Sequence, residues 1–357
     1  MDSSRRARSK RIGFLHSANA GGHSDLVPSR HALPEFDMAQ QRNGHKMADS
    51  LVTFESKPEA RYLLAGWRRQ WSNGGRISSG LPRYLIEKLE AQKIGEMDRT
   101  VSELCYPFQL AGTHDTYRPK TSYLDGLPAG PLQRENAFYD AGNGLIIFLG
   151  EEPSHQIELY AKAFFQGISD LGISQTVAVE GVNGSAPPDL ERRINCVYSK
   201  ADMKETLERY GVQFSSYGSE GRRGPTIAMA LVTLAHYEYP DVEMFRFGAM
   251  APLYPFTTRE NEQLGINIDH QSYYDIMRRV RSMFKLDLDL SELRTMGESE
   301  SNQLAERLEE IGEANAEAKQ LIDRIREDYV YTPFVEPVDL DPALDDALND
   351  ILRGLDC

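Results

Sequence analysis

The sequence predicts an α/β protein in which a mixed, mostly parallel sheet is covered by helices on both faces. Short apolar runs of strand length alternate with longer segments in which apolar residues recur every three or four positions. Glycine-bearing turns join the two kinds of segment, as is typical of strand–turn–helix units. Two apolar runs on either side of the turn at residues 141–144 indicate a β-hairpin, which makes the sheet mixed.

The same criteria place the elements in chain order. The expected strands span residues 62–65, 100–105, 138–139, 145–149, 176–180, 195–198 and 243–247. The expected helices span residues 80–92, 154–171, 203–210, 223–237 and 273–284, followed by a long helix over residues 298–329. Residues 107–136 hold four prolines and several glycines and are expected to form a loop.

The most informative stretch is the turn after the first strand, which holds both tryptophans of the chain. Large aromatic residues at the carboxyl end of a strand mark a ligand or partner surface, or else fold back onto the core. The turn matches neither a Walker-type phosphate loop nor the dinucleotide fingerprint. Its polar residues are still placed to contact an anion near a helix start. The alternative is a tight turn in which glycine supplies a positive φ. The residues singled out here are Trp67, Arg68, Trp71, Ser72, Gly74 and Gly75.

A second candidate is Glu151-Glu152-Pro153-Ser154, which follows the strand 145–149. Doubly wound sheets bind ligands at the carboxyl ends of their strands. Paired carboxylates perform acid–base chemistry when their pKa values are pushed apart. The alternative is that adjacent glutamates point in different directions, one of them a surface charge, and that Pro153-Ser154 only starts the helix.

Three further turns are expected at the same edge of the sheet. Gly181 ends the strand 176–180. Residues 218–226, which include Gly221 and two arginines, precede a helix and form either an anion site or a surface loop. The prolines around Tyr254 predict a rigid turn that places this tyrosine at the edge. We therefore expect Trp67, Glu152 and Tyr254 to share one rim of the sheet.

The long helix over residues 298–329 carries a heptad pattern held for about four repeats. Asn315 falls on the apolar seam, where a buried amide fixes register at a cost in stability. The seam serves either self-association or, as we prefer, packing on the helix at 273–284 or on the rest of the chain's own domain. The apolar positions are Leu304, Leu308, Ile311, Ala318, Ile322, Ile325 and Tyr329.

Composition divides the chain into four parts. Residues 1–58 are rich in polar residues and are expected to form a disordered or loosely attached leader, with Met38 and Met47 as alternative starts. Residues 59–270 form the α/β domain, 271–330 a helical subdomain and 331–357 an acidic tail. Residues 297–357 hold seventeen acidic and five basic residues, which suits a basic partner or a solvated surface.

Bulk properties exclude several classes of protein. No apolar run approaches the roughly 20 residues that span a bilayer, and no apolar stretch follows the basic start, as a secretory signal requires. The net charge of −14 and the lack of a basic face argue against nucleic-acid binding. Three cysteines without metal spacing indicate a reducing, cytoplasmic setting, with Cys105 and Cys196 in the core. We expect no metal and no cofactor.

The order and spacing of these motifs resemble the proteasome assembly chaperone family in its bacterial and archaeal branch. The resemblance implies an α/β/α sandwich similar to nucleoside phosphorylases and the assistance in proteasome assembly for which the family is named. Most bacterial members have no established activity, so the resemblance supplies no catalytic residues to carry over. The long acidic helix resembles the helical extension of actinobacterial-type members. Proteasome-binding relatives often dock through a C-terminal hydrophobic-Tyr-X tail, which the last residues, Leu355-Asp356-Cys357, lack. The matching motifs are Leu63-Leu64-Ala65-Gly66-Trp67, Ser72-Asn73-Gly74-Gly75, Tyr84-Leu85-Ile86-Glu87-Lys88-Leu89, Ile147 to Ser154, Gly221 to Pro225 and Ala251-Pro252-Leu253-Tyr254-Pro255.

We expect a non-enzymatic assembly or protein-binding factor, because no nucleophile–base constellation is apparent. The alternative is a small-molecule binding protein or hydrolase that uses a nucleoside or nucleotide-like ligand in a cleft at the sheet's carboxyl edge. A protein partner or a homo-oligomer is expected in the first case. The candidate binding residues are Trp67, Arg68, Trp71, Ser72, Gly74, Gly75, Glu151, Glu152, Ser154, Gly181, Gly221 and Tyr254.

Overall fold

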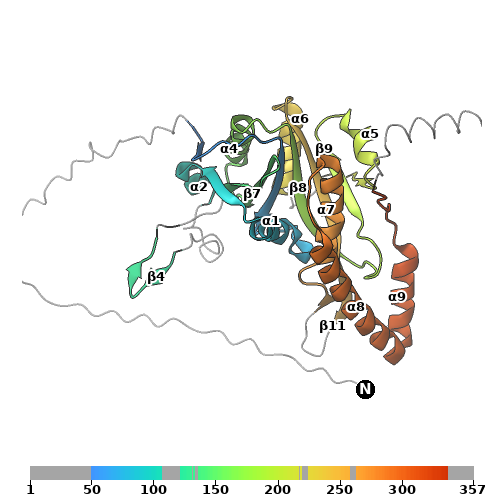
Figure 1. Cartoon of the computed structure of the whole chain (residues 1–357). Coiled ribbons are helices and arrows are strands. Elements are labelled where there is room, and N and C mark those ends of the chain that lie inside the picture. The colour runs from blue at the N-terminus through green and yellow to red at the C-terminus, as the bar shows by residue number, and fades with distance from the viewer. Residues whose placement is uncertain are drawn as a thin grey trace, which may run out of the picture. The chain divides into compact units, whose positions relative to one another are not determined.

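A large mixed β-sheet with helices on both faces forms the centre of the protein (Figure 1). The structure, a computed structural model, describes residues 50–106, 121–130, 132, 136–216, 218, 224–257 and 263–336. These residues all belong to one unit, residues 47–357. The predicted α/β class and the mixed sheet are confirmed.

Within the described residues the sheet has ten strands, in the order β1-β3-β6-β7-β2-β8-β11-β9-β10, with β12 paired to β11. The strands are β1 (Val52–Phe54), β2 (Tyr62–Arg68), β3 (Gln92–Met97), β6 (Ala137–Asp140), β7 (Leu145–Glu151), β8 (Gln175–Gly184), β9 (Ile194–Tyr198), β10 (Gln213–Phe214), β11 (Glu243–Thr257) and β12 (Gln263–Gly265). A separate hairpin joins β4 (Tyr123–Leu124) and β5 (Leu127–Pro128).

The four central strands, β7, β2, β8 and β11, run parallel, so their carboxyl ends meet at one edge. In register, Leu64 of β2 lies between Ile147 of β7 and Val177 of β8. Both faces of these strands are buried, which explains their continuous apolar runs. The expected hairpin is confirmed as the antiparallel pair β6–β7. The pairs β1–β3, β3–β6 and β11–β9 are also antiparallel, and outside the four central strands only β9–β10 among the described strands is a parallel pair.

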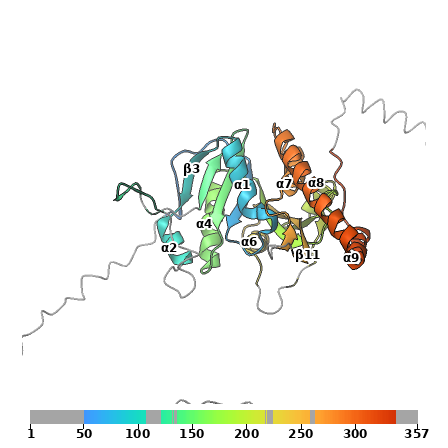
Figure 2. The same cartoon turned by 90° about the horizontal axis from the view of Figure 1, so that it is seen from below.

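Helices cover the two faces through amphipathic stripes. On one face lie α2 (Arg99–Cys105), α4 (Ile157–Asp170) and α6 (Ile227–Tyr237), and on the other α1 (Ile77–Lys88), α5 (Met203–Glu208) and α7 (His270–Phe284). Figure 2 shows α7 beside α1, with α8 (Ser291–Ala314) against α7. The helix α7, which the sequence assigns to a helical subdomain, thus packs directly on the sheet.

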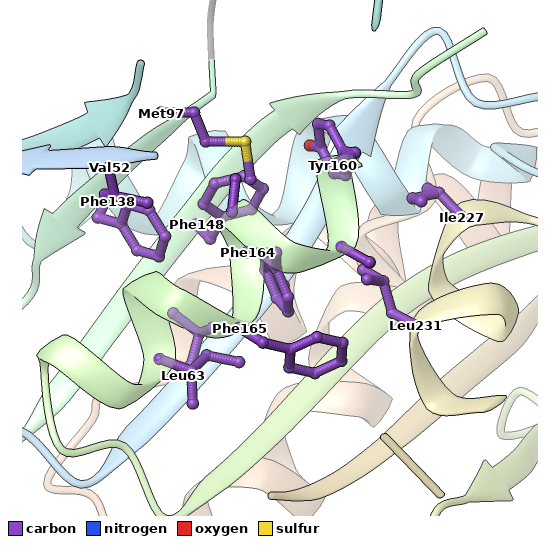
Figure 3. Packing of buried hydrophobic residues seen from close by; sticks show 14 of the residues in the cluster. Val52, Leu63, Met97, Phe138, Phe148, Tyr160, Phe164, Phe165, Ile227 and Leu231 are labelled. Atoms are coloured by element: carbon purple, nitrogen blue, oxygen red, sulfur yellow. The ribbon is translucent and has the colours of Figure 1, made fainter. Parts of the chain in front are cut away.

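The core beneath α4 is aromatic. Within the sheet the ring of Phe138 packs on that of Phe148, which in turn packs edge-on against Phe164 of α4, close to Tyr160 (Figure 3). Side chains four residues apart on α4 point to the same face, so Tyr160, Phe164 and Ile168 all enter this cluster. Cys105 and Cys196 are buried free thiols, as predicted, and burial raises the pKa of Cys105 to about 12.

Three local predictions are wrong. Residues 100–105 form the helix α2 rather than a strand, because the Asp98 side chain accepts a hydrogen bond from the Thr100 amide at 2.8 Å and starts a helix. The predicted helix 80–92 ends at Lys88, and the polar strand β3 follows it. The expected turn around Tyr254 is extended strand: beyond Pro252, β11 pairs only with β12, where prolines are tolerated.

The leader boundary predicted at residue 58 falls after the first strand. Within the described part of residues 1–58, β1 pairs antiparallel with β3, and Val52 is buried in the core. The free energy gained by burying this one short apolar run attaches the chain to the sheet edge. The boundary was predicted too late in the chain because the average composition of residues 1–58 is polar.

The predicted single helix 298–329 is two helices, α8 and α9 (Ala316–Asp328), which diverge from a sharp bend (Figure 1). Asn315 lies at the bend with extended backbone, and its side chain accepts hydrogen bonds from the amides of Glu317 and Ala318. It therefore caps α9 instead of sitting in a seam. The apolar stripe closes on itself, since Ile322 and Ile325 pack with Leu304 and Leu308. No described helix has the length and apolar content of a membrane span.

Candidate functional site

The candidate site lies along the carboxyl edge of the parallel strands, which we call the rim: residues 68–76, 151–156, 180–184 and 224–227. α1 begins after β2 and α4 begins after β7, so both helices start at the rim. α6 precedes β11 and therefore also has its first residues there. Ligands and partners of parallel sheets meet this edge because loops from several strands converge on it.

Trp67 does not face the rim. It is the sixth residue of β2 and is fully buried between Phe148 and Phe164. Its indole N–H donates to the Tyr160 hydroxyl at 3.0 Å, which satisfies the polar end of the ring. Of the two alternatives for Trp67, burial against the core is observed and the surface role is wrong, because β2 continues through this residue and directs its side chain under α4.

Trp71 is the exposed tryptophan, with 55% of its surface accessible. It borders an open groove of about 450 Å³, which we call the Trp71 groove. The walls are mostly apolar. Pro153 comes from the segment that leads into α4, Ile157 is the first residue of that helix, and Ile227 is the first residue of α6. The lining residues are Trp71, Glu152, Pro153, Ile157, Gly224, Pro225 and Ile227.

Glu152 joins the two sides of this groove. One carboxylate oxygen accepts the Trp71 amide at 3.2 Å, and the other accepts the Ile227 amide at 3.3 Å. Burial raises the pKa of Glu152 from 4.5 to about 7, although the two amides act in the opposite direction. The carboxylate thus connects the turn after β2 to the first residue of α6.

Glu151 points elsewhere, as expected for adjacent residues. Its carboxylate is buried and contacts Arg68 at 3.4 Å and Arg69 at 3.6 Å. Its backbone carbonyl accepts the Tyr106 hydroxyl at 2.5 Å. Glu151 and Arg68 therefore hold the end of β7 against the end of β2.

A buried polar network lies beneath the rim and was not predicted from the sequence. Glu180 of β8 is fully buried and accepts from Arg246 of β11 at 2.6 Å and from the Gln70 amide group. Gln70 in turn accepts from Ser78 at 3.1 Å. The only sequence signal is one charged residue within each of two apolar strands, and burial of charge requires a partner that sequence alone does not reveal.

The glycines of the rim permit close contact between strands. A side chain at Gly181 would begin 1.9 Å from the Gly74 carbonyl oxygen. Gly75 adopts a φ of +57°, and a side chain there would meet Asp269 and Ala251. Ser72 completes the contact by donating its hydroxyl to the Gly181 carbonyl at 3.1 Å. Gly74, Gly75, Ser72 and Gly181 thus build the rim rather than project from it.

The remaining candidates separate. Ser154 is exposed and its amide donates to the Cys105 carbonyl at 3.2 Å, while α4 begins three residues later. Gly221 lies outside the described residues. Tyr254 is buried with Leu304 and Leu308 of α8, in a cluster distinct from that of Trp67. The predicted cleft shared by Trp67, Glu152 and Tyr254 is therefore wrong, because β11 runs past the rim before reaching Tyr254.

A second buried ion pair, also missed from sequence, fixes α7. Arg192 is fully buried, contacts both oxygens of Asp269 at 3.0 and 3.2 Å, and donates to the Pro188 and Leu190 carbonyls. Asp269 also caps α7 by accepting the Ser272 amide. These groups satisfy one another and are structural. The described residues hold no cluster of three His, Cys, Asp or Glu side chains suited to a metal ion.

Comparison with known proteins identifies the family. The model of the PAC2 family matches residues 70–309, more than half of the chain. The chain belongs to the PAC2 family. The resemblance to proteasome assembly chaperones is thereby confirmed at family level. No curated protein matches the sequence.

Solved PAC2-type structures share the fold. A Corynebacterium glutamicum protein of unknown function superposes with a TM-score of 0.58 at 11% identity, covering 77% of this chain and 95% of that one. Mycobacterium tuberculosis Rv2125, described as a proteasome-assembly chaperone homologue, gives 0.54 at 15% identity, covering 69% and 94%. A Streptomyces avermitilis PAC2 family protein gives 0.52 at 16% identity, covering 69% and 95%. At these identities the likeness concerns the fold alone.

Proposed function

We propose that this PAC2 family protein is a non-enzymatic, protein-binding factor with a chaperone-like role in assembly. Family membership supports the general role. The observation that carries the proposal is the exposed indole of Trp71 at the mouth of an open apolar groove. Tryptophans in such positions are common anchors of protein interfaces, since covering the ring removes a large apolar area from water.

The polar groups of the rim support binding rather than catalysis. Both oxygens of Glu152 are engaged by backbone amides, and Glu151 is paired with two arginines. Neither carboxylate is presented to a substrate as an acid next to a base. The groove instead offers apolar side chains from three separate segments, a surface that suits an apolar anchor of a partner protein.

The proposal includes a cytoplasmic location, supported by the odd cysteine count, and self-association as a second form of protein binding. Light scattering of the purified full chain separates the two forms of binding. A monomer that captures a different protein favours the assembly role, and a discrete homo-oligomer that is lost on changing Trp71 favours self-association through the same groove.

The test keeps Trp71 and places a photo-crosslinking amino acid at position 157 of the full chain, which lines the Trp71 groove and is 39% exposed. The control position is Tyr237, which is 77% exposed at the far end of α6. Extracts of the native host are irradiated and the products identified by mass spectrometry. We expect one stoichiometric partner from position 157 only. Trp71→Ala should weaken binding of that partner by at least about tenfold, while Tyr237→Ala leaves it unchanged. Equal yields at both positions would contradict the proposal.

A further inference from the structure

A second cavity opens on the other side of the turn that carries Trp71. It has a volume of about 590 Å³ and shares no lining residue with the Trp71 groove. We call it the Arg76 cavity. It lies where the turn after β2 meets the end of β8. Its other walls come from Leu253 of β11, from residues 263–267, which include β12, and from Arg307 of α8. The polar side chains that line it are Asn73, Arg76, Asn183, Gln263, Asn267 and Arg307.

The charge of this cavity is the reverse of that of the whole protein. Arg76 and Arg307 supply two positive charges, and none of the described lining residues is acidic, although the chain carries a net charge of −14. Both arginine side chains are exposed. Within the described residues, neither guanidinium has an ion pair or a hydrogen bond. The nearby carboxylate of Glu300 is engaged by His270 at 2.6 Å.

The backbone holds Arg76 in an unusual conformation. Its φ of +53° and ψ of +27° lie in the left-handed region. A residue with a Cβ atom, such as arginine, adopts this conformation at a cost in free energy. The preceding residues are fixed: a side chain at Gly74 would meet Asn183, and Asn73 is bonded to Ser79 through both ends of its amide. The turn therefore presents Arg76 from a rigid base, which a binding site requires.

We propose that the Arg76 cavity binds a small phosphate ester. A phosphomonoester carries a charge of about −1.5 to −2 near neutral pH, and the two arginines of the cavity neutralise it. A ligand with a single carboxylate carries a charge of −1, which one arginine would neutralise. Arginine binds phosphate oxygens through paired N–H groups. The side-chain amides of Asn183 and Asn267 supply further donors for the third oxygen or for the rest of the ligand. The volume lies within the range of small-molecule sites, about 300–1,000 Å³.

The test uses isothermal titration of the full chain in low-salt buffer without phosphate. The probes are inorganic phosphate, pyrophosphate, a sugar phosphate and a nucleoside monophosphate, with succinate and citrate as carboxylate probes. The double variant Arg76→Gln/Arg307→Gln is compared with Arg83→Gln/Arg294→Gln. The control removes the same charges from the same two helical regions, α1 and α8, at exposed arginines that do not line the cavity.

We expect at least one phosphate probe to bind the wild type and the control with equal affinity. The double variant Arg76→Gln/Arg307→Gln should weaken binding of that probe about tenfold or more, since hydrogen bonds to charged groups are lost. Three results would overturn the proposal: no phosphate probe binds, the cavity variant and the control weaken binding alike, or only carboxylates bind. These outcomes are independent of the Trp71 groove, because Trp71→Ala should leave phosphate binding unchanged.

Discussion

The two ends of one short turn, Trp71 and Arg76, present opposite chemistry. Trp71 faces an apolar groove formed by the starts of α4 and α6, whereas Arg76 faces a polar cavity with amides and a second arginine. The turn itself does not set this difference. The neighbours do: Pro153 and Ile157 follow β7, while Asn183 and Arg307 come from β8 and α8. In a parallel sheet, the residues of the neighbouring elements therefore decide whether a rim turn faces an apolar or a polar surface.

Both ends depend on the same buried support. Gln70 connects the turn to the Glu180–Arg246 pair, and Ser72 and Gly74 lie directly on Gly181. Changes in this support should affect both sites together, and changes at either end should affect one.

Arg246→Met should give the largest loss of stability, about 3–5 kcal/mol, because it leaves Glu180 buried without its ion-pair partner. Urea denaturation of the purified chain measures the free energy of unfolding. The double variant Arg246→Met/Glu180→Leu should be less destabilised than the single variant, since it removes the uncompensated charge as well. A loss below about 1 kcal/mol for Arg246→Met would show that the pair does not support the turn.

Gly181→Ala should cost about 3 kcal/mol, because the new methyl group would begin 1.9 Å from the Gly74 carbonyl oxygen and force the turn away from β8. Both Trp71-dependent partner binding and phosphate binding should fall. The matched control is Gly130→Ala, where a side chain meets no atom within 4 Å. Equal urea midpoints for the two variants would contradict the close contact between turn and strand.

Glu152→Gln should change the pH dependence of stability. The pKa of Glu152 is raised from 4.5 to about 7 in the folded state, so the folded chain binds a proton that the unfolded chain lacks. Its contribution is present below pH 4.5 and is lost as the pH rises through about 7, by about 3 kcal/mol in total. The variant should lack this slope in denaturation curves between pH 4.5 and 8. Glu158→Gln, an exposed change on α4, should retain it.

Arg76→Gly should give the smallest effect and the opposite sign. Glycine adopts the left-handed conformation without strain, so we expect stability to rise by about 0.5–1 kcal/mol while phosphate binding is lost. Partner binding at Trp71 should be unchanged. A destabilised variant would indicate that the arginine side chain contributes to the fold and would remove the contrast between the two ends of the turn.

The periodicity of apolar residues was sufficient to predict most strands and helices of the α/β sandwich. The strands around Leu64, Ile147 and Val177 and the helices α4 and α6 were predicted because their apolar runs reflect burial on both faces of a sheet or on one face of a helix. The helix α2 and the bend at Asn315 were missed because a single capping side chain decided each of them. One hydrogen bond outweighs a weak average pattern at such boundaries.

The candidate site was only half predictable. Trp71, Glu152 and the glycines were found because turns after buried strands converge on one edge of a parallel sheet. Trp67 and Tyr254 were misplaced, because β2 and β11 extend further than their apolar cores indicate. Glu180, Arg246 and Arg307 were missed, since a charged residue in a strand or helix gives no sign of the partner or cavity that it faces.

The layered α/β architecture, the position of the rim and the PAC2-type resemblance were predictable from the chain alone, because these follow from the local order of apolar runs and glycine turns. Which side chains of the rim face solvent, and which residues share a buried ion pair or a cavity, was known only from the folded arrangement, since residues as far apart as Asn73 and Arg307 line one cavity. The physical reason is that burial and charge pairing depend on neighbours in space, whereas periodicity records only neighbours along the chain.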